Sequence, residues 1–411
     1  MTEQDNLGGQ SAGKELAGVQ SAGKEGKEGE QSKWRSQLVS NGDVVFEQRG
    51  NAGLITLNRP KALNALTLAM VRDLTTALTA WRDDASIKVV AIRGSNKLGQ
   101  PGTPEALFGG FCAGGDIRFL HQAALANDPD LDAFFTEEYQ LNYLIAAYPK
   151  PYIAFMDGVV MGGGMGISQG SRLRIVGPKT RMAMPETGIG LFPDVCGSYF
   201  LSRSPVGLYL GLTGKMINAA DALYARLADR YMASAAIEQL CAALDRQTWS
   251  DNPADDLAAL VESHASVPAE ASAFEILQAP IDRHFVPQKS VVDMLASLAS
   301  ETQFPDWAND TIATLKKRSP TLLEVTRRQL NRGGTQTLAE NFRMELGIIY
   351  HCFEHGYLME GIRAVILDKD NSPQWQPATL DAVQESTITA FFASRWNGHP
   401  HPLANLESLY G

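Results

Sequence analysis

Two carboxylates lie close together in the segment MPETGIGLFPDVCGSYF, residues 184–200. Glu186 and Asp194 are eight residues apart across a compact turn rich in glycine and proline. Carboxylates can act as general bases, general acids or nucleophiles, so two of them facing one pocket could carry out acid–base or covalent chemistry. The other interpretation is a helix cap beside a solvated acid, and the pair alone leaves both open.

Two glycine-rich stretches could present backbone N–H groups to a ligand. Residues 113–116 read AGGD, and residues 162–164 are three glycines that follow a strand-like run and begin a helix. Together they could supply two converging donors to one oxygen, which is what an oxyanion hole requires. Each stretch alone is also compatible with a tight turn, and Asp116 with a helix N-cap.

The elements that must position these motifs alternate between β and α patterns. Strand-like apolar runs begin at Val44, and helical spacing follows over residues 71–81. The alternation continues through a buried strand at 88–94, one strand over YIAFMDGVV (152–160) and another at 172–178. The pattern predicts a layered α/β domain with short loops.

Three regions are expected along the chain. Residues 1–40 are dominated by small and charged side chains and predict a disordered tail. Residues 41–232 form the α/β core, and residues 233–411 form a helical region packed on it. Proline joints, including Ala279-Pro280, are expected to separate its helices.

Composition excludes several classes of function. A net charge of −10 argues against binding to nucleic acid or to an anionic membrane. No run of about 20 apolar residues predicts a membrane span. Four scattered cysteines predict neither a zinc site nor a disulfide framework, and His351 and His355 have ligand spacing but no third ligand nearby, so no metal is expected. Acidic residues in the first 30 positions argue against a mitochondrial presequence, so we expect a cytoplasmic protein.

The order of the motifs resembles the crotonase (enoyl-CoA hydratase/isomerase) superfamily. The resemblance runs from NRPKALNAL (58–66) through FCAGGDI, GGGMGIS and MPETGIGLFPDV to LTGKMINAADALYARLAD (212–229). It implies a spiral of ββα units as the core. EEYQLNYLIAAYPKPYIAFMDGVVMGGGMGIS, SPTLLEVTRRQL and EGIRAVILDKDNSPQW are similar to the 3-hydroxyisobutyryl-CoA hydrolase branch, and the last two lie in the helical half.

The resemblance implies a role for each residue of a site. The N–H groups of Ala113 and Gly163 are expected to hold the thioester carbonyl oxygen, with Gly114 beside them. Glu186 is expected to activate water or to attack the carbonyl carbon directly, and the choice stays open. Asp194 is expected to bind the 3-hydroxyl group of the substrate.

Two further residues complete the expected substrate site. The hydrolase branch implies that Glu138 contacts the substrate, together with the backbone of Gly163. The superfamily places the loop of Lys61 and Arg59 near the nucleotide, so Lys61 is expected to meet CoA phosphates. Solvated surface charge is an equal interpretation of these two cations.

Some positions depart from the patterns of these families. Enoyl-CoA hydratases use two glutamates, and the first of those positions is Gly166 here, which argues against hydration. Cys196 replaces the glycine that this branch usually has after PDV, so the turn with Asp194 is expected to be crowded or rigid. Residues 96–110 form a longer hinge than usual before Ala113.

We therefore expect hydrolysis of a short branched 3-hydroxyacyl-CoA, with 3-hydroxyisobutyryl-CoA of valine catabolism as the substrate. CoA is part of that substrate, and no separate cofactor is expected. The acyl-CoA is the expected partner, and assembly into a homo-oligomer is left open. The alternatives are an enoyl-CoA hydratase or isomerase and a non-catalytic acyl-CoA-binding protein.

Overall fold

The structure is a computed structural model that describes residues 34–95 and 110–410. The chain divides into a unit over Met1–Leu38 and a unit over Val39–Gly411. Residues 1–33 of the expected tail and residues 96–109 of the expected hinge lie outside the described residues. The second unit contains every candidate site residue.

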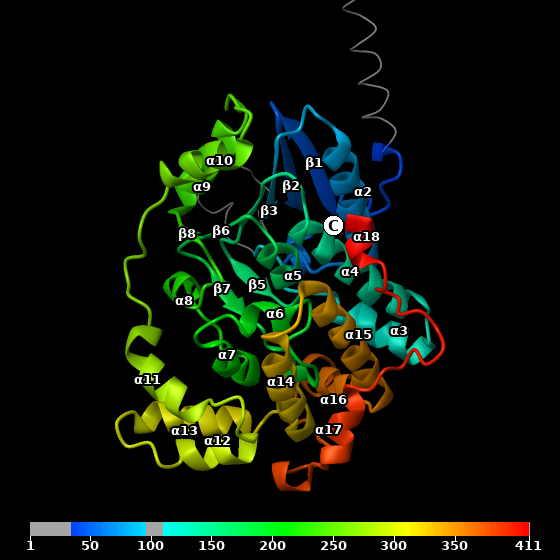
Figure 1. The fold of residues 1–411 in the computed structure, drawn as a ribbon, viewed down its shortest axis with the longest axis vertical. Helices are drawn as coiled ribbons and strands as arrows, with labels where there is room; N and C mark the ends of the chain where they lie inside the picture. The colour runs from blue at the N-terminus through cyan, green and yellow to red at the C-terminus, as the bar shows by residue number, and fades with distance from the viewer. Residues whose placement is uncertain (1–33, 96–109, 411) are drawn as a thin grey trace, which may run out of the picture. The chain divides into compact units, whose positions relative to one another are not determined.

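A six-stranded sheet forms the centre of this second unit (Figure 1). Its order is β1-β2-β3-β4-β6-β8, with β1 antiparallel to β2 and the other neighbours parallel. The strands are β1 Val44–Arg49, β2 Ala52–Leu57, β3 Val89–Gly94, β4 Tyr152–Phe155, β6 Leu173–Val176 and β8 Arg230–Tyr231. The central strands are apolar along their length because helices cover both faces.

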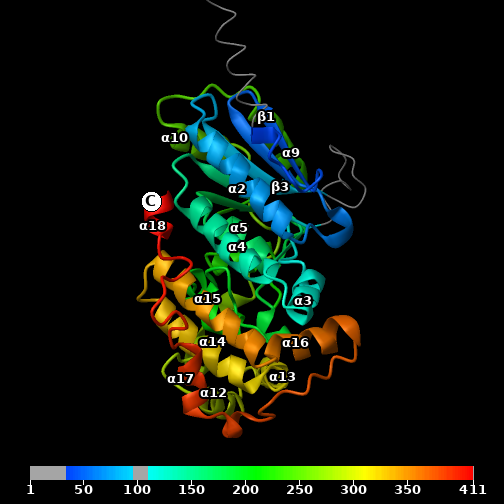
Figure 2. The same cartoon turned by 90° about the vertical axis from the view of Figure 1, so that its right-hand side faces the viewer.

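The two faces of the sheet are covered by helices from different parts of the chain. Ala52 and Leu54 pack with Ile237 and Leu257 of α9 (Ser234–Ala243) and α10 (Pro253–Glu262). Gly53 between them faces α2 (Leu68–Asp83), because a Cβ added to it would lie 2.5 Å from the Trp81 ring. This alternation follows the period of two along a strand. Figure 2 shows α2 lying along the β1 to β3 side of the sheet.

The segment YIAFMDGVV is two strands, so the prediction of one strand was wrong. Its first half is β4, and its second half is β5 (Val159–Met161), which pairs in parallel with β7 (Arg181–Ala183) in a separate two-stranded sheet. The chain bends at Gly158, whose φ of 124° favours glycine. The preceding residue, Asp157, holds the bend by accepting hydrogen bonds from Lys179 N and Ser234 Oγ.

Helices of different lengths connect the strands and carry the motifs. They are η1 Pro60–Ala62, α3 Ile117–Ala126, α4 Asp130–Ala146, α5 Gly163–Gln169, η3 Glu186–Ile189, α6 Gly197–Leu201, α7 Gly207–Thr213 and α8 Ala219–Tyr224. Asp116 is the N-cap of α3, because its side chain accepts a hydrogen bond from Phe119 N. This confirms the structural interpretation of that aspartate.

After β8 the described chain is helical. The remaining helices are α11 Phe274–His284, α12 Val291–Leu298, α13 Pro305–Leu315, α14 Pro320–Gly333, α15 Leu338–Glu354, α16 Tyr357–Ile362, α17 Glu385–Phe391 and α18 Leu406–Tyr410, with shorter turns at 363–367 and 380–382. Pro280 lies inside α11, so the joint expected at Ala279-Pro280 is wrong. The long apolar run after Leu338 breaks at Gly356, where φ is 72°.

The later helices pack onto the α/β core around the candidate motifs. Helix α14 contacts α6 and α7, and α15 contacts α4 and α6. Figures 1 and 2 show α14, α15 and α16 beside one another. Within the described residues, no helix combines the length and apolar character needed to cross a membrane.

Candidate active site

Backbone pairing brings the two glycine motifs together. Cys112 N donates to Val159 O at 3.0 Å, and Met161 N donates to Cys112 O at 3.0 Å, so the segment before Gly114 runs beside β5. Strand β5 leads directly into Gly162 and helix α5. A Cβ added to Gly114 would lie 3.6 Å from Gly163 N. The two glycine motifs are therefore neighbours in the structure, as expected.

Two N–H groups at this junction have no acceptor among the described residues. Gly163 is the first residue of α5, where no intrahelical acceptor exists for its N–H. Gly115 lies between Gly114, whose carbonyl accepts from Leu66 N, and Asp116, whose N–H donates to Leu66 O. Its own N–H therefore points away from Leu66. A Cβ added to Gly163 would lie 3.4 Å from Gly115 N, so the two donors are neighbours.

The donor role expected for Ala113 does not fit this geometry. Ala113 N already donates to Leu63 O at 3.0 Å, so its hydrogen is not available to a substrate. Gly115, two residues later, has the free N–H. Gly114 contributes by its conformation, because its φ of 106° favours glycine and lets the strand approach Met161 closely.

Three buried carboxyl groups lie near one another at this site. Glu138 on α4 is 2% exposed, Glu186 at the start of η3 is 5% exposed, and Asp194 in the following turn is 6% exposed. A Cβ added to Gly163 would lie 2.5 Å from Glu138 Oε1, and one added to Gly162 would lie 2.9 Å from Glu186 Oε1. The glycines therefore make room for the two glutamates.

Hydrogen bonding to these carboxyl groups is sparse. Tyr139 donates its hydroxyl to Asp194 Oδ2 at 3.3 Å. Glu138 Oε1 and Glu186 Oε2 are buried and have no hydrogen-bond partner among the described residues. Buried polar atoms are normally partnered, and orphan atoms often mark a place where a ligand or water binds. The two orphan oxygens are therefore positioned to meet a substrate.

Burial dominates the electrostatics of the site. It raises the pKa of Glu186 well above its usual range, and the neighbouring Asp194 carboxylate raises it further. Burial and then Asp194 also raise the pKa of Glu138. Burial raises the pKa of Asp194 to about 7, against the hydrogen bond from Tyr139, which lowers it. Three acids that disfavour each other's ionisation can hold protons near neutral pH, as acid–base catalysis requires.

Neighbouring residues pack closely against Gly166 and leave no space for an acidic side chain at this position. A Cβ added to it would lie 2.6 Å from Asn142 Nδ2 and 2.9 Å from Val195 Cβ. Separations below 3 Å require a neighbour to move, and both neighbours are buried. The position that carries an acid in hydratases therefore has neither the acid nor the room for it.

The turn that carries Asp194 is strained, in line with the expectation for Cys196. Val195 has a φ of 49° and Cys196 a φ of 68°, so two successive residues with side chains adopt the left-handed conformation. Cys196 N donates to Glu345 of α15. Glu345 is a fourth buried carboxyl group at the site, and no motif in the sequence indicated it.

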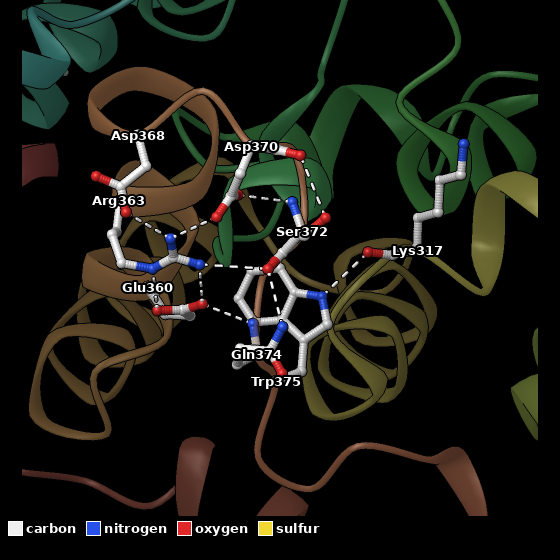
Figure 3. A network of polar contacts seen from close by, with 8 residues as sticks. All are labelled: Lys317, Glu360, Arg363, Asp368, Asp370, Ser372, Gln374 and Trp375. Carbon is white, nitrogen blue, oxygen red and sulfur yellow. Dashed lines mark hydrogen bonds and ion pairs between the residues drawn. The ribbon is translucent and has the colours of Figure 1, made fainter.

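The segment EGIRAVILDKDNSPQW supports the loop after Glu186. Arg363 binds the carboxylates of Glu360, Asp368 and Asp370, and Gln374 N donates to Glu360, which folds the chain into a compact network (Figure 3). The network places Trp375, whose Nε1 donates to Lys317 O at 3.0 Å.

The same segment packs directly on the backbone of η3. A Cβ added to Gly190 would lie 3.0 Å from the Trp375 ring and would collide with the carbonyl of Tyr357. A Cβ on Gly361 of α16 would collide with the carbonyl of Ile189. This motif of the helical half therefore bears on Glu186 through close backbone packing.

The remaining predicted residues lie outside this cluster. Lys61 is exposed on η1. Its loop adjoins the strand of Gly115, because Arg59 pairs with Asp116 and Asn64 Nδ2 donates to Gly110 O. All four cysteines are free and buried. Nowhere in the described residues do three histidine, cysteine or acidic side chains gather as metal ligands.

Comparison with known proteins identifies the class. Residues 52–392 match the family described as enoyl-CoA hydratase/isomerase. The chain belongs to this family, and its core has the crotonase fold that the motifs predicted. A solved structure described as a carnitinyl-CoA dehydratase from Mycobacterium thermoresistibile matches with a TM-score of 0.75 at 38% identity, covering 86% of this chain and 97% of that one.

Relatives within the family carry a different name. The chain is 40% identical over 358 residues to "3-hydroxyisobutyryl-CoA hydrolase, mitochondrial" of Danio rerio, covering 86% of this chain and 90% of the relative. It is 37% identical over 365 residues to the protein of the same name from Rattus norvegicus, covering 87% and 91%. The predicted resemblance to this branch is confirmed.

Proposed function

We propose that the protein hydrolyses 3-hydroxyisobutyryl-CoA to 3-hydroxyisobutyrate and CoA. The observation that carries the proposal is the orphan Oε2 of buried Glu186, whose Oε1 lies against Gly162, the residue before the free N–H of Gly163. A carboxylate beside two converging donors suits attack on a thioester carbonyl. The names of the relatives support the same reaction and substrate.

In the proposed reaction, the thioester carbonyl oxygen accepts hydrogen bonds from Gly115 and Gly163. Glu186 either removes a proton from water, which attacks the carbonyl carbon, or attacks that carbon itself to give an anhydride that water cleaves. Both routes break the C–S bond, consume one water molecule and release the acid and the thiol. In both, the N–H groups stabilise the negative charge of the tetrahedral intermediate.

The other two acids bind the acyl group in this proposal. Asp194 accepts a hydrogen bond from the 3-hydroxyl group, and Glu138 lines the acyl pocket beside Gly163. Lys61 is proposed to meet the CoA phosphates from its exposed loop. No separate cofactor takes part, because CoA is carried by the substrate. We further propose that the reaction belongs to valine catabolism, because 3-hydroxyisobutyryl-CoA is an intermediate of that pathway.

Hydration or dehydration is the second candidate, because the structure from Mycobacterium thermoresistibile is described as a dehydratase. The crowded Gly166 opposes it, since a two-acid mechanism needs an acid where no side chain fits. A non-catalytic acyl-CoA-binding role is opposed by three buried acids, which such a protein would carry at an energetic cost without using them. The cytoplasmic location stays a prediction, since the relatives are named mitochondrial.

A substrate comparison tests the proposal. Thiol release from 3-hydroxyisobutyryl-CoA, followed with Ellman's reagent, is measured beside the absorbance loss of crotonyl-CoA on hydration. We expect thiol release to exceed hydration by at least about 100-fold, the contribution of one general acid–base group. Faster hydration would assign the protein to the dehydratase type.

A further inference from the structure

Glu345 of α15 is fully buried. From the helical half of the chain, it binds the turn that carries Asp194. Its Oε2 accepts a hydrogen bond from Cys196 N at 2.6 Å, and its Oε1 accepts one from Ser198 N at 2.9 Å. The Ser198 hydroxyl also donates to Oε1. One carboxylate from a distant helix therefore binds two backbone amides on either side of Gly197, directly after Asp194.

Gln329 of α14 binds the same turn from its other end. Its Nε2 donates to Pro193 O at 2.7 Å and to Glu345 Oε1 at 3.2 Å. Gln329 and Glu345 are both 0% exposed. The backbone on both sides of Asp194 is therefore fixed by two side chains that are themselves bonded to each other.

This arrangement holds a backbone that would otherwise relax. The left-handed conformations of Val195 and Cys196 cost energy in residues with side chains, so they persist only when surrounding contacts enforce them. The hydrogen bond to Cys196 N acts on one of these two residues directly. Strain maintained by specific contacts next to a reactive group is typical of functional sites.

We propose that Glu345, supported by Gln329, is a positioning residue that sets Asp194 against Glu186 and so determines the turnover rate. The inference rests on the proposed function, because it takes Asp194 and Glu186 as members of the active site. Glu345 touches no reacting atom in the proposed reaction. It acts through the backbone of residues 193–198.

Glu345 also has an electrostatic effect on the site. This effect distinguishes a positioning residue from one that only stabilises the fold. The groups near it that titrate are Asp194, Glu186, the Tyr139 hydroxyl and the Cys196 thiol. Burial raises the pKa of Glu345 to about 8, so its negative charge is present mainly above that pH, where it raises the pKa of Glu186 after burial and the charge of Asp194. Removing the charge should therefore shift the titration of the active site, which a merely structural residue would not do.

The test is Glu345→Gln in the full chain, assayed for thiol release from 3-hydroxyisobutyryl-CoA. The amide has nearly the same shape, but it places an NH₂ donor against backbone N–H donors and removes the charge. We expect kcat to fall at least about tenfold, the loss expected when reacting groups are misplaced, while KM changes little. The pH profile should change mainly above about pH 8, where wild-type Glu345 is charged and the glutamine is not.

Glu340→Gln is the matched control, because Glu340 lies on the same helix, is exposed, and can keep its capping hydrogen bond as an amide. It should keep both kcat and the pH profile. Gln329→Leu serves if Glu345→Gln does not fold. It removes the bond to Pro193 O but keeps the Glu345 carboxyl group, so kcat should fall while the pH profile above about pH 8 stays as in the wild type.

The outcomes distinguish this inference from the proposed function. Wild-type protein without thiol release would overturn the proposed function and this inference with it. Active wild-type protein with unchanged kcat in folded Glu345→Gln would overturn this inference alone. If Glu345→Gln does not fold, an unchanged kcat in Gln329→Leu would likewise overturn this inference. A lower melting temperature without any change in kcat or pH profile would assign Glu345 a purely structural role.

Discussion

Glu186 has one carboxylate oxygen against Gly162 and the other without a partner among the described residues, and Asp194 lies near enough to raise its pKa. These surroundings favour a carboxyl group that exchanges protons near neutral pH. Asp194 differs, because it accepts a hydrogen bond from Tyr139. The two acids therefore have different environments, which suits different roles in one reaction.

Asp194→Asn separates recognition of the substrate from the chemical step. If Asp194 binds the 3-hydroxyl group, the variant should lose about 10-fold to 150-fold in kcat/KM on 3-hydroxyisobutyryl-CoA, the equivalent of a hydrogen bond to a charged group. Isobutyryl-CoA, which lacks the hydroxyl group, should be much less affected. The measurement is kcat/KM for both esters. Equal losses on the two esters would place Asp194 in the chemical step instead.

The sequence indicated the acids of the site but not the second backbone donor. Glu138, Glu186 and Asp194 belong to segments that resemble the hydrolase branch of the family, and the structure brings all three together. The family resemblance implied Ala113 as this donor, and only the bond from Ala113 N to Leu63 O shows that the free N–H belongs to Gly115. The direction of a backbone N–H depends on which segment its own segment pairs with, and the local sequence does not specify that pairing.

At the scale of elements, η3 and the turn after it hold Glu186 and Asp194, and neither element is stabilised by its own residues alone. Helix α16 packs against Ile189, and Trp375 packs against Gly190. Apolar periodicity predicted β1, β2, β3 and β6, the helix of residues 71–81 and a helical second half, but it did not predict β7 or β8. It missed the break between β4 and β5, because a bend at one glycine does not disturb an apolar run.

Gly361→Ala tests whether packing of α16 positions η3. The added methyl group would collide with the carbonyl of Ile189, so the loop with Glu186 must move. We expect kcat to fall at least about tenfold, because small misplacements of reacting groups have large effects. Gly347→Ala on α15 is the control, since its added methyl group would lie 3.7 Å from Trp396, an ordinary contact. Full activity in folded Gly361→Ala would contradict this role of α16.

At the scale of the whole molecule, the helical half completes the active site as well as the core. Helices α9 and α10 cover one face of the sheet, and α14, α15 and α16 contact the segment with Glu186 and Asp194. The sequence predicted that the helical half packs on the core. It could not predict the partners, because Glu345 and Cys196 are 149 residues apart and nothing local links them.

The buried acids also set how stability depends on pH. The pKa of folded Asp194 is about 7 and that of Glu345 about 8, both above their values in an unfolded chain, and the pKa values of Glu138 and Glu186 are raised too. The folded state therefore binds more protons than the unfolded state. Their contribution to stability is complete below the unfolded pKa of about 4 and is lost as the pH rises through the folded values.

We accordingly expect the melting temperature to fall between about pH 5.5 and pH 8.5. Asp194→Asn should reduce the slope, since an amide does not titrate, and it should stabilise the protein more at high pH than at low pH. Thermal melts of both proteins across this range provide the measurement. A rising melting temperature, or identical slopes in the two proteins, would show that these acids are not buried as described.

The central claim is that the Glu186 carboxylate carries out hydrolysis, and Glu186→Gln tests it most directly. Thiol release from 3-hydroxyisobutyryl-CoA should fall at least about 1000-fold, within the range for loss of an acid–base group. Calorimetric binding of the ester should persist, because the proposed carbonyl donors are the backbone N–H groups of Gly115 and Gly163. A Glu186→Gln protein that binds the ester and releases thiol at the wild-type rate would contradict this mechanism.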